Sequence, residues 1–507
     1  MAKIQVLTDQ VKSSIDPLIF GHFTEHAFKN IYDGMYEPGS PLSDEDGFRV
    51  DVLEALRKVK TPLLRYPGGN FVSNYHWEDG IGPKSERKRV FEYAWLTEES
   101  NQFGTVDFIK LCRKIGAEPL ICVNMGTGTV EEAMHWVEYC NGTGDTYYAN
   151  LRRSHGYEEP FGVKYWGLGN EMYGLWQMNH KEAEAYADYA LEFAKALKWV
   201  DPSIKLIACG YEQTSDWGYT VMKKIGTLVD YVSAHHYAVG WGPFERDNYR
   251  NSLYIPEYMQ KLTDLTMAAV YSGMNDTSDV KVAWDEWNLF GWLVDRVNED
   301  SSYTLHNTII TALILNMFIR NSDKIGMANY STFVNINGAV STHENGIVKR
   351  AQYYAFELLA NHTGSVAYPV YVDCEKFRIP VSESAKIGRP DPGIDLNNMN
   401  KAADTKLVDI PKIDCAASGD EDGRIYLSIV NKDPDEDIDV TIALSGLAGY
   451  KVVKSYIIYH ECITAANTIE APDTVVTQEN EIPAVDQTGI QMKLKKHSVN
   501  LLVVERD

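Results

Sequence analysis

The sequence predicts an α/β protein: a (β/α)8 TIM barrel followed by a C-terminal antiparallel β-sandwich of jelly-roll type. Eight short apolar runs alternate with helical segments through the first two-thirds of the 507 residues. Alternating runs rich in β-branched residues fill the last third. No glycine-rich phosphate loop follows the first apolar run, although a doubly wound open sheet would require one.

The eight apolar runs have the length of buried strands, and most end in a polar residue or glycine. They cover residues 19–26, 62–69, 118–126, 163–171, 204–211, 229–237, 280–288 and 326–335. Helical spacing of apolar residues separates many of them, over 48–60, 106–116, 181–200 and 304–320. Strands alternating with helices indicate crossover units and a parallel sheet, and eight units fit a closed barrel.

The pattern changes after about residue 362. Four runs alternate apolar and polar residues between Gly, Asn and Asp turns, over 424–431, 437–444, 452–459 and 498–505. This spacing is typical of an antiparallel sandwich. We therefore divide the chain into 1–15, an N-terminal strand that joins the sandwich, 16–361, the catalytic barrel, and 362–507, the sandwich. The polar stretch 382–404 is expected to be a loop.

Composition narrows the class of protein. Lys and Arg number 48 against 71 Asp and Glu, a net charge of −23. Such a surface repels nucleic acid and anionic membranes and suits a neutral substrate. Seven scattered cysteines without a CxxC pair argue against a zinc ribbon or a disulfide framework. The N-terminus MAKIQVLTDQ has no apolar signal region. We expect a cytoplasmic protein without a cofactor.

The carboxyl ends of barrel strands carry the active site in this fold. The fourth run ends in Asn170 and Glu171, and the seventh ends in Asp285 and Glu286. These two strands stand nearly opposite each other, and glycosidic cleavage needs two carboxylates that face each other across a pocket. Glu171 and Glu286 are the predicted pair. Because side chains alternate along a strand, either Asp285 or Glu286 should point into the helix layer.

Other strand ends contribute hydrogen-bonding and aromatic groups of the kind that bind sugars. The polar and tyrosine side chains are His22, Glu25, His26, Arg65, Asn70, Asn124, His235, His236 and Tyr237, and the tryptophans are Trp77, Trp95, Trp176, Trp241, Trp284, Trp287 and Trp292. Aromatic rings can stack on sugar C–H faces, although any single tryptophan is also explained by packing.

A metal site is the competing interpretation of the histidines. His22, His26 and His235 belong to two predicted strands and can be imagined as a histidine–carboxylate cluster. No HExxH or His-x-His motif is present, so hydrogen bonds from these histidines to carboxylates are the favoured reading.

Several segments match one known family. Two long segments, GHFTEHAFKNIYDGMYEP and LLRYPGGNFVSNYHWEDGIGP, are specific, as is VKYWGLGNEMYGLWQ. YAWLTEESNQFGTVDFI, AHHY, AWDEWN and AANTIEAP add to them. With these motifs the chain resembles family 51 of the glycoside hydrolases, the intracellular α-L-arabinofuranosidases.

The resemblance implies a retaining enzyme in which Glu171 is the acid/base, Glu286 is the nucleophile, and the carboxyls are about 5–5.5 Å apart. It also implies a set of sugar-binding residues: Glu25, Asn70, Trp95, Asn170, His235, Tyr237 and Gln352. Members are often hexameric, which implies a homo-oligomer. The chain departs from the family pattern at Leu96, in NLFGW after the nucleophile, and around Gln352.

The leading hypothesis is an exo-acting, retaining α-L-arabinofuranosidase. It would remove non-reducing arabinofuranosyl residues from arabinan- or arabinoxylan-derived oligosaccharides by double displacement, without a metal. Alternatives are a β-1,4-glucanase or β-xylosidase on the same scaffold, a metal-dependent barrel hydrolase, and a non-catalytic sugar-binding protein.

Overall fold

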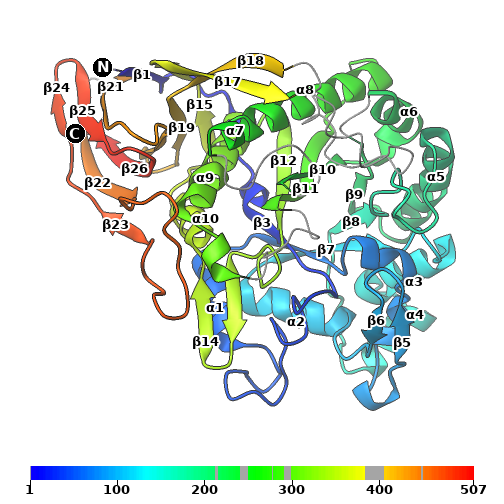
Figure 1. Cartoon of the computed structure of the whole chain (residues 1–507). Helices are drawn as coiled ribbons and strands as arrows, with labels where there is room; N and C mark the ends of the chain where they lie inside the picture. The colour runs from blue at the N-terminus through cyan, green and yellow to red at the C-terminus, as the bar shows by residue number, and fades with distance from the viewer. Residues whose placement is uncertain are drawn as a thin grey trace.

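A computed structural model describes residues 2–211, 215–239, 249–276, 278–290, 299–382, 405–446 and 449–506 (Figure 1). Within these ranges, no helix is both long and apolar enough to cross a bilayer. The predicted loop, from residue 383 onward, lies outside the described residues, as do Trp241 and Trp292.

Eight strands close into a barrel in the order β10-β11-β12-β3-β4-β7-β8-β9. Each neighbouring pair is parallel. Each strand overlaps one of the eight predicted runs, so the barrel prediction is confirmed. The strands are β3 (Gly21–Phe23), β4 (Leu63–Tyr66), β7 (Glu118–Val123), β8 (Tyr165–Leu168), β9 (Lys205–Ala208), β10 (Tyr231–Val239), β11 (Lys281–Phe290) and β12 (Ile325–Ser331).

Helices surround the barrel (Figure 1). The four predicted from apolar spacing are α1 (Val50–Lys58), α2 (Thr105–Ile115), α5 (Ala183–Val200) and α9 (Leu305–Arg320). The others are α3 (Val130–Asn141), α4 (Tyr147–Ser154), α6 (Ser215–Ile225), α7 (Tyr249–Ser252), α8 (Ile255–Met274) and α10 (Ala351–Asn361). Short hairpins extend from the loops: β5 (Val90–Glu92) with β6 (Thr97–Glu99), and β13 (Val340–His343) with β14 (Gly346–Lys349).

Helix α9 joins the two halves of the molecule. Every residue from Leu305 to Ile319 is buried, because the helix contacts barrel strand β11 on one side and the sandwich on the other. A helix that is apolar on all sides is expected in such a position. At its end, Asn316 and Arg320 both donate to Oδ1 of Asp414 at 2.8 Å.

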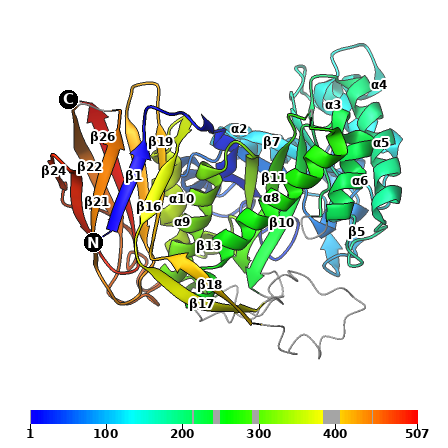
Figure 2. The same cartoon turned by 90° about the horizontal axis from the view of Figure 1, so that it is seen from above.

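Two sheets form the C-terminal part (Figure 2). One has the order β16-β1-β21-β25-β24 and the other β2-β15-β19-β20-β26-β22-β23. Apolar side chains of both sheets form a second core between them. The first sheet contains β1 (Ala2–Leu7), β16 (Val370–Asp373), β21 (Ile438–Ser445), β24 (Ala484–Asp486) and β25 (Gly489–Leu494). The second contains β2 (Ser13–Ser14), β15 (Val366–Tyr368), β19 (Ile413–Gly419), β20 (Ile425–Asn431), β22 (Tyr450–Ile458), β23 (Thr477–Glu479) and β26 (Ser498–Arg506).

Both ends of the chain contribute to these sheets. Strand β1 runs parallel to β21 and antiparallel to β16, and β2 pairs with β15. A separate hairpin of β17 (Lys376–Ser382) and β18 (Thr405–Pro411) lies alongside the barrel (Figure 2).

Candidate active site

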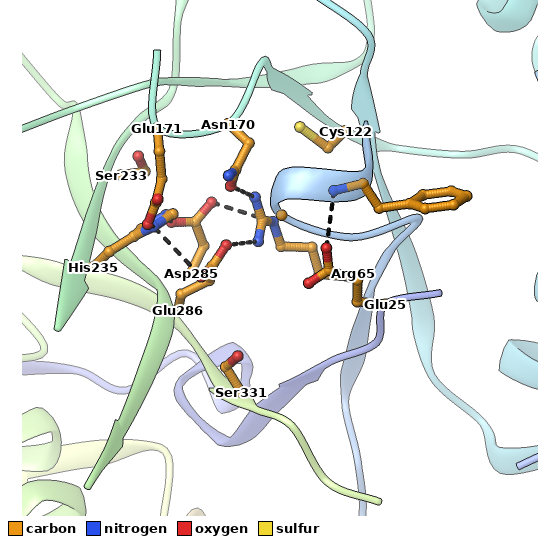
Figure 3. A network of polar contacts seen from close by, with 12 residues as sticks. Glu25, Arg65, Cys122, Asn170, Glu171, Ser233, His235, Asp285, Glu286 and Ser331 are labelled. Atoms are coloured by element: carbon orange, nitrogen blue, oxygen red, sulfur yellow. Dashed lines mark hydrogen bonds and ion pairs between the residues drawn. The ribbon is translucent and has the colours of Figure 1, made fainter. Parts of the chain in front are cut away.

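Arg65 lies at the centre of the polar network at the carboxyl end of the barrel (Figure 3). It is buried, and its guanidinium donates to Oε1 of Glu286 at 2.7 Å and to Oδ1 of Asn170 at 2.8 Å. Its Nε lies 3.5 Å from Oδ2 of Asp285, and its carbon Cζ lies 4.8 Å from the ring centre of Phe23. Burial opposes the charge, but Asp285 and Glu286 outweigh it and raise the pKa of Arg65. Arg65 is therefore a fixed cation between carboxylates.

Glu286, on β11, has both carboxylate oxygens occupied. Arg65 binds Oε1, and the Tyr237 hydroxyl donates to Oε2 at 2.7 Å. The same hydroxyl lies 2.7 Å from the Ser331 hydroxyl. Burial first, and then the charge of Glu286, raise the pKa of Tyr237 well above its ordinary value, so the phenol keeps its proton. Two donors therefore hold both oxygens of this buried carboxylate in place.

Glu171 follows β8 with a left-handed backbone (φ 44°). Nδ1 of His235 lies 2.8 Å from its Oε1, and the Trp176 indole donates to its Oε2 at 2.5 Å. Nε2 of His235 lies 2.8 Å from Oδ1 of Asp285. Burial lowers the pKa of His235. This effect is outweighed by the charges of Glu286 and Asp285 and by hydrogen bonds to Asp285 and Glu171, and the resulting pKa is about 10. An imidazolium therefore lies between Glu171 and Asp285.

Asp285 and Glu286 both face the site, so the expectation that one of them points into the helix layer is wrong. The cause lies in the register of the strands. The β11–β12 pairing shifts between Trp284 and Trp287, and the β10–β11 pairing shifts between Ser233 and His235. Such a bulge breaks the simple alternation of side chains. Two consecutive carboxylates thereby reach Arg65.

Glu25 lies on the other side of Arg65 (Figure 3). Its Oε1 accepts the backbone N–H of Phe71 at 2.9 Å and the indole N–H of Trp95 at 3.0 Å. Burial, followed by the charge of Glu286, raises the pKa of Glu25 to about 8. Glu25 is therefore protonated at neutral pH and can donate a hydrogen bond.

Of the other residues predicted to bind the sugar, Asn170 and Asn70 lie at or beside the polar network, whereas Gln352 lies away from it. Asn170 joins the network through Arg65 and lies 3.4 Å, through Nδ2, from Oε1 of Gln177. Asn70 follows Gly69, whose backbone passes beside Glu286 and Asn170. Gln352 is buried at the start of α10 and donates to the carbonyl of Gly338 at 3.0 Å. No contact between Gln352 and this network is found among the described residues, and its sugar-binding role stays a prediction.

Only part of the tryptophan set lies at the site. Trp95 and Trp176 bind the carboxylates of Glu25 and Glu171. Trp77, Trp284 and Trp287 are buried in the core, where the first two donate to the carbonyl of Glu132 and the hydroxyl of Thr263. They cannot stack on a sugar, because packed side chains cover both faces.

The three histidines of the alternative metal-site interpretation lie in different surroundings. His22 packs against the rings of Phe333 and Phe356, where burial lowers its pKa to about 3. His26 stacks on Phe71 and pairs with Glu99 at 3.1 Å. In the part of the chain that the structure describes, Glu171, His235 and Glu286 alone bring three ligand atoms within 4.8 Å of one another.

Comparison with known proteins decides the family. A family model described as "Alpha-L-arabinofuranosidase 1 domain" matches residues 55–278, and "Alpha-L-arabinofuranosidase C-terminal domain" matches residues 285–498. The "Probable alpha-L-arabinofuranosidase C" of Aspergillus niger is 37% identical, over 97% of this chain and 94% of its own. The thermostable GH51 α-L-arabinofuranosidase from Thermotoga petrophila RKU-1 is 40% identical, and its solved structure matches 100% of both chains with a TM-score of 0.88. The chain belongs to glycoside hydrolase family 51.

A bacterial relative extends the match to the full length. The "Intracellular exo-alpha-(1->5)-L-arabinofuranosidase 1" of Bacillus subtilis is 31% identical over 100% of both chains. A xyloglucanase of glycoside hydrolase family 44, at 14% identity and a TM-score of 0.63, shares the fold alone. This family 51 chain is thus a glycoside hydrolase whose barrel and sandwich both align with its relatives.

Sequence reasoning placed Arg65 at a strand end without giving it a role, and it did not single out Gln177 or Ser331. A charged residue inside the apolar run PLLRYPGG was the available signal for Arg65, because a buried cation needs carboxylate partners. Gln177 donates to the hydroxyl of Ser73 at 2.5 Å from a loop whose path no periodicity predicts.

Proposed function

We propose that this family 51 enzyme is a retaining, exo-acting α-L-arabinofuranosidase. Its substrates would be arabinan- or arabinoxylan-derived oligosaccharides, from which it removes non-reducing arabinofuranosyl residues. The observation that carries the proposal is the close approach of two carboxylates, since oxygens of Glu171 and Glu286 lie within 4.8 Å of each other. Retaining enzymes place their carboxyls about 5–5.5 Å apart, whereas inverting enzymes need about 6.5–9.5 Å to admit a water molecule.

The hydrogen bonds support separate roles for the two glutamates. Glu286, held in place by Arg65 and Tyr237, attacks the anomeric carbon and forms a covalent glycosyl-enzyme. Glu171 gives a proton to the departing glycosidic oxygen and then, as a base, activates the water that hydrolyses the intermediate. His235 stabilises negative charge on both carboxyls, at 2.8 Å from Glu171 and 3.6 Å from Glu286. These steps use the side chains of the site and one water molecule.

The pocket wall supports recognition of one terminal sugar. A protonated Glu25 can donate to one hydroxyl, and the amide of Asn170 lies beside Glu286. We propose that these residues contact the furanose together with Asn70, Trp95, His235, Tyr237 and Gln352. The Bacillus relative, whose name specifies exo action on α-(1→5) linkages, supports the exo mode.

The cellular setting is part of the proposal. The Bacillus relative is named intracellular, which supports a cytoplasmic enzyme that completes the breakdown of imported oligosaccharides. The net charge of −23 suits neutral sugars better than nucleic acid or anionic membranes. We also propose a homo-oligomer, with the hexamer common in the family as the expected state.

A panel of aryl glycosides tests the activity. We expect hydrolysis of the aryl α-L-arabinofuranoside, and NMR should show a first-formed product with the anomeric configuration of the substrate. Glu286→Ala should lower turnover by at least about 10⁴-fold, because the nucleophile is lost, whereas the surface variant Glu192→Ala should retain activity. Faster hydrolysis of the β-xyloside or β-glucoside would favour those alternatives, and an inverted product would exclude the proposed mechanism.

A further inference from the structure

A second cavity of about 300 Å³ lies next to the catalytic pocket. It is bounded by hairpin β5–β6 and by two short 3-10 helices, Asn70–Asn74 and Trp77–Gly80. Four aromatic residues line it, of which Phe71 and Tyr75 are buried and only Phe91 and Tyr93 offer open ring faces. Phe91 and Tyr93 are 49% and 57% exposed, so the open side of the cavity presents two large rings to solvent.

This cavity shares a wall with the catalytic pocket. Phe71 lines the cavity, and its backbone N–H donates to Glu25 at the catalytic site. Glu92, which also lines the cavity, accepts the backbone N–H groups of Ala94 and Trp95 at 2.7 Å each. The Trp95 indole in turn donates to Glu25. A molecule in the cavity would therefore contact the residues that hold the Trp95 turn in place.

The polar groups of the cavity include an acceptor without a donor. Asn101 is 1% exposed, and its Nδ2 donates to the carbonyl of Lys88, yet its Oδ1 has no hydrogen-bond partner among the described residues. Glu92 is buried as well, and burial raises its pKa. Because Asn101 Oδ1 is covered and both oxygens of Glu92 accept backbone N–H groups, the polar groups open to a ligand are those of Asn74, His76 and Asp79, which line the same cavity and can meet hydroxyl groups.

The combination defines the chemical class of the ligand. Aromatic faces suit the C–H side of a sugar ring, and acceptors along the same wall suit its hydroxyls. Small-molecule sites span roughly 300–1,000 Å³, so this cavity has room for one ring and not for an extended chain.

We propose that this cavity is a second sugar site, which takes one arabinofuranosyl unit of an oligosaccharide and stabilises the turn that carries Trp95. The choice of sugar rests on the proposed function. A bound unit orders Glu92–Trp95 from outside the catalytic pocket, so occupancy of the second site strengthens binding in the first.

Calorimetry with α-1,5-linked arabinotriose tests the site on the full-length Glu286→Ala protein, which cannot turn the sugar over. Two binding events per chain are expected. Adding Phe91→Ala or Tyr93→Ala should weaken one event at least tenfold and leave the other within about threefold. Tyr371→Ala, at a tyrosine of β16 in the sandwich that is 61% exposed, is the matched control and should keep both events.

The outcomes separate this inference from the proposed function. A single event in Glu286→Ala, or two events unaffected by both cavity variants, overturns the second site. Wild-type hydrolysis of the aryl arabinofuranoside is measured in parallel, since its failure would overturn the proposed function instead. Because Phe91 and Tyr93 are largely exposed, an unchanged melting temperature verifies that the variants fold.

Discussion

The imidazole of His235 joins the acid/base candidate Glu171 to Asp285, with Nε2 only 2.8 Å from Oδ1 of Asp285. Asp285 also lies against Arg65, so its charge is shared between two cations. This arrangement gives Asp285, a residue that need not touch the sugar, a role in keeping the His235 ring protonated and oriented.

The substitution Asp285→Asn removes the negative charge of this side chain and keeps its size and shape. The pKa of His235 should then fall below about 10, since Asp285 is one of the two charges that raise it. A hydrogen bond to a charged group is worth about 1.5–3 kcal/mol, so kcat/KM should fall roughly 10- to 150-fold. The alkaline limb of the pH–rate profile should move to lower pH. An unchanged profile, equal to that of the exposed control Asp276→Asn, would contradict the role.

Glu171→Ala should affect substrates according to their leaving group. A phenol of low pKa departs without a proton, whereas a sugar hydroxyl needs the general acid. We expect glycosylation of the enzyme to slow by about 10²- to 10⁴-fold with arabino-oligosaccharides, and much less with an activated aryl arabinofuranoside. Rapid-quench kinetics on both substrates measures the difference. Equal losses on the two would show that Glu171 is not the acid.

Glu25→Gln should change how stability depends on pH. The pKa of Glu25 is about 8 in the fold against an ordinary value of 4.5. Between these values the native state holds a proton that the unfolded state releases, so the wild type loses stability as pH rises through this window. Gln cannot ionise and avoids that loss. The melting-temperature difference in favour of the variant should grow from pH 5 to pH 9. A difference independent of pH, as expected for the exposed control Glu98→Gln, would refute this.

Gly69→Ala tests how closely the backbone approaches the nucleophile. A Cβ at Gly69 would lie 2.8 Å from Oε1 of Glu286 and 3.3 Å from Nδ2 of Asn170, so at least one of these side chains must shift. Misplacing a reacting group by about 1 Å can cost 10²-fold in rate, and we expect a loss of that size in kcat/KM. Gly144→Ala, whose Cβ would meet only a methyl group at 3.6 Å, should behave as wild type. Equal kcat/KM values for Gly69→Ala and Gly144→Ala would contradict the prediction, because they would mean that Glu286 and Asn170 can shift without loss of activity.

The fold could be predicted because apolar spacing is a local property that the tertiary structure preserves. The eight runs became barrel strands, and the segment 304–320 became α9, whose apolar surface is buried on all sides. The opposition of Glu171 to the Asp285–Glu286 pair followed from strand order, and the choice of Glu286 rested on the chemistry of glycosidic cleavage and the family resemblance. Those features depend on period and position, which a sequence displays directly.

Other parts of the site depend on geometry that no local pattern encodes. The bulges in β10 and β11 bring both Asp285 and Glu286 inward, against the alternation rule. Trp284 and Trp287 flank the same carboxylates and yet lie in the core, whereas Trp176 reaches Glu171 from a loop. A register shift and a loop path arise from the packing of the whole barrel, so sequence reasoning could not assign these side chains.

The parallel pairing of β1 with β21 has a consequence for biosynthesis. The N-terminal strand leaves the ribosome first, but its partner starts at Ile438, so about 430 residues must be made before the two can meet. At roughly 5–20 residues per second, this interval is about 20–90 s. During that time the barrel can be completed while β1 keeps an unpaired edge. The nascent chain therefore passes through a stage in which the exposed edge of β1 can pair with another chain. Protection of that edge, for example by a chaperone, then favours folding over aggregation.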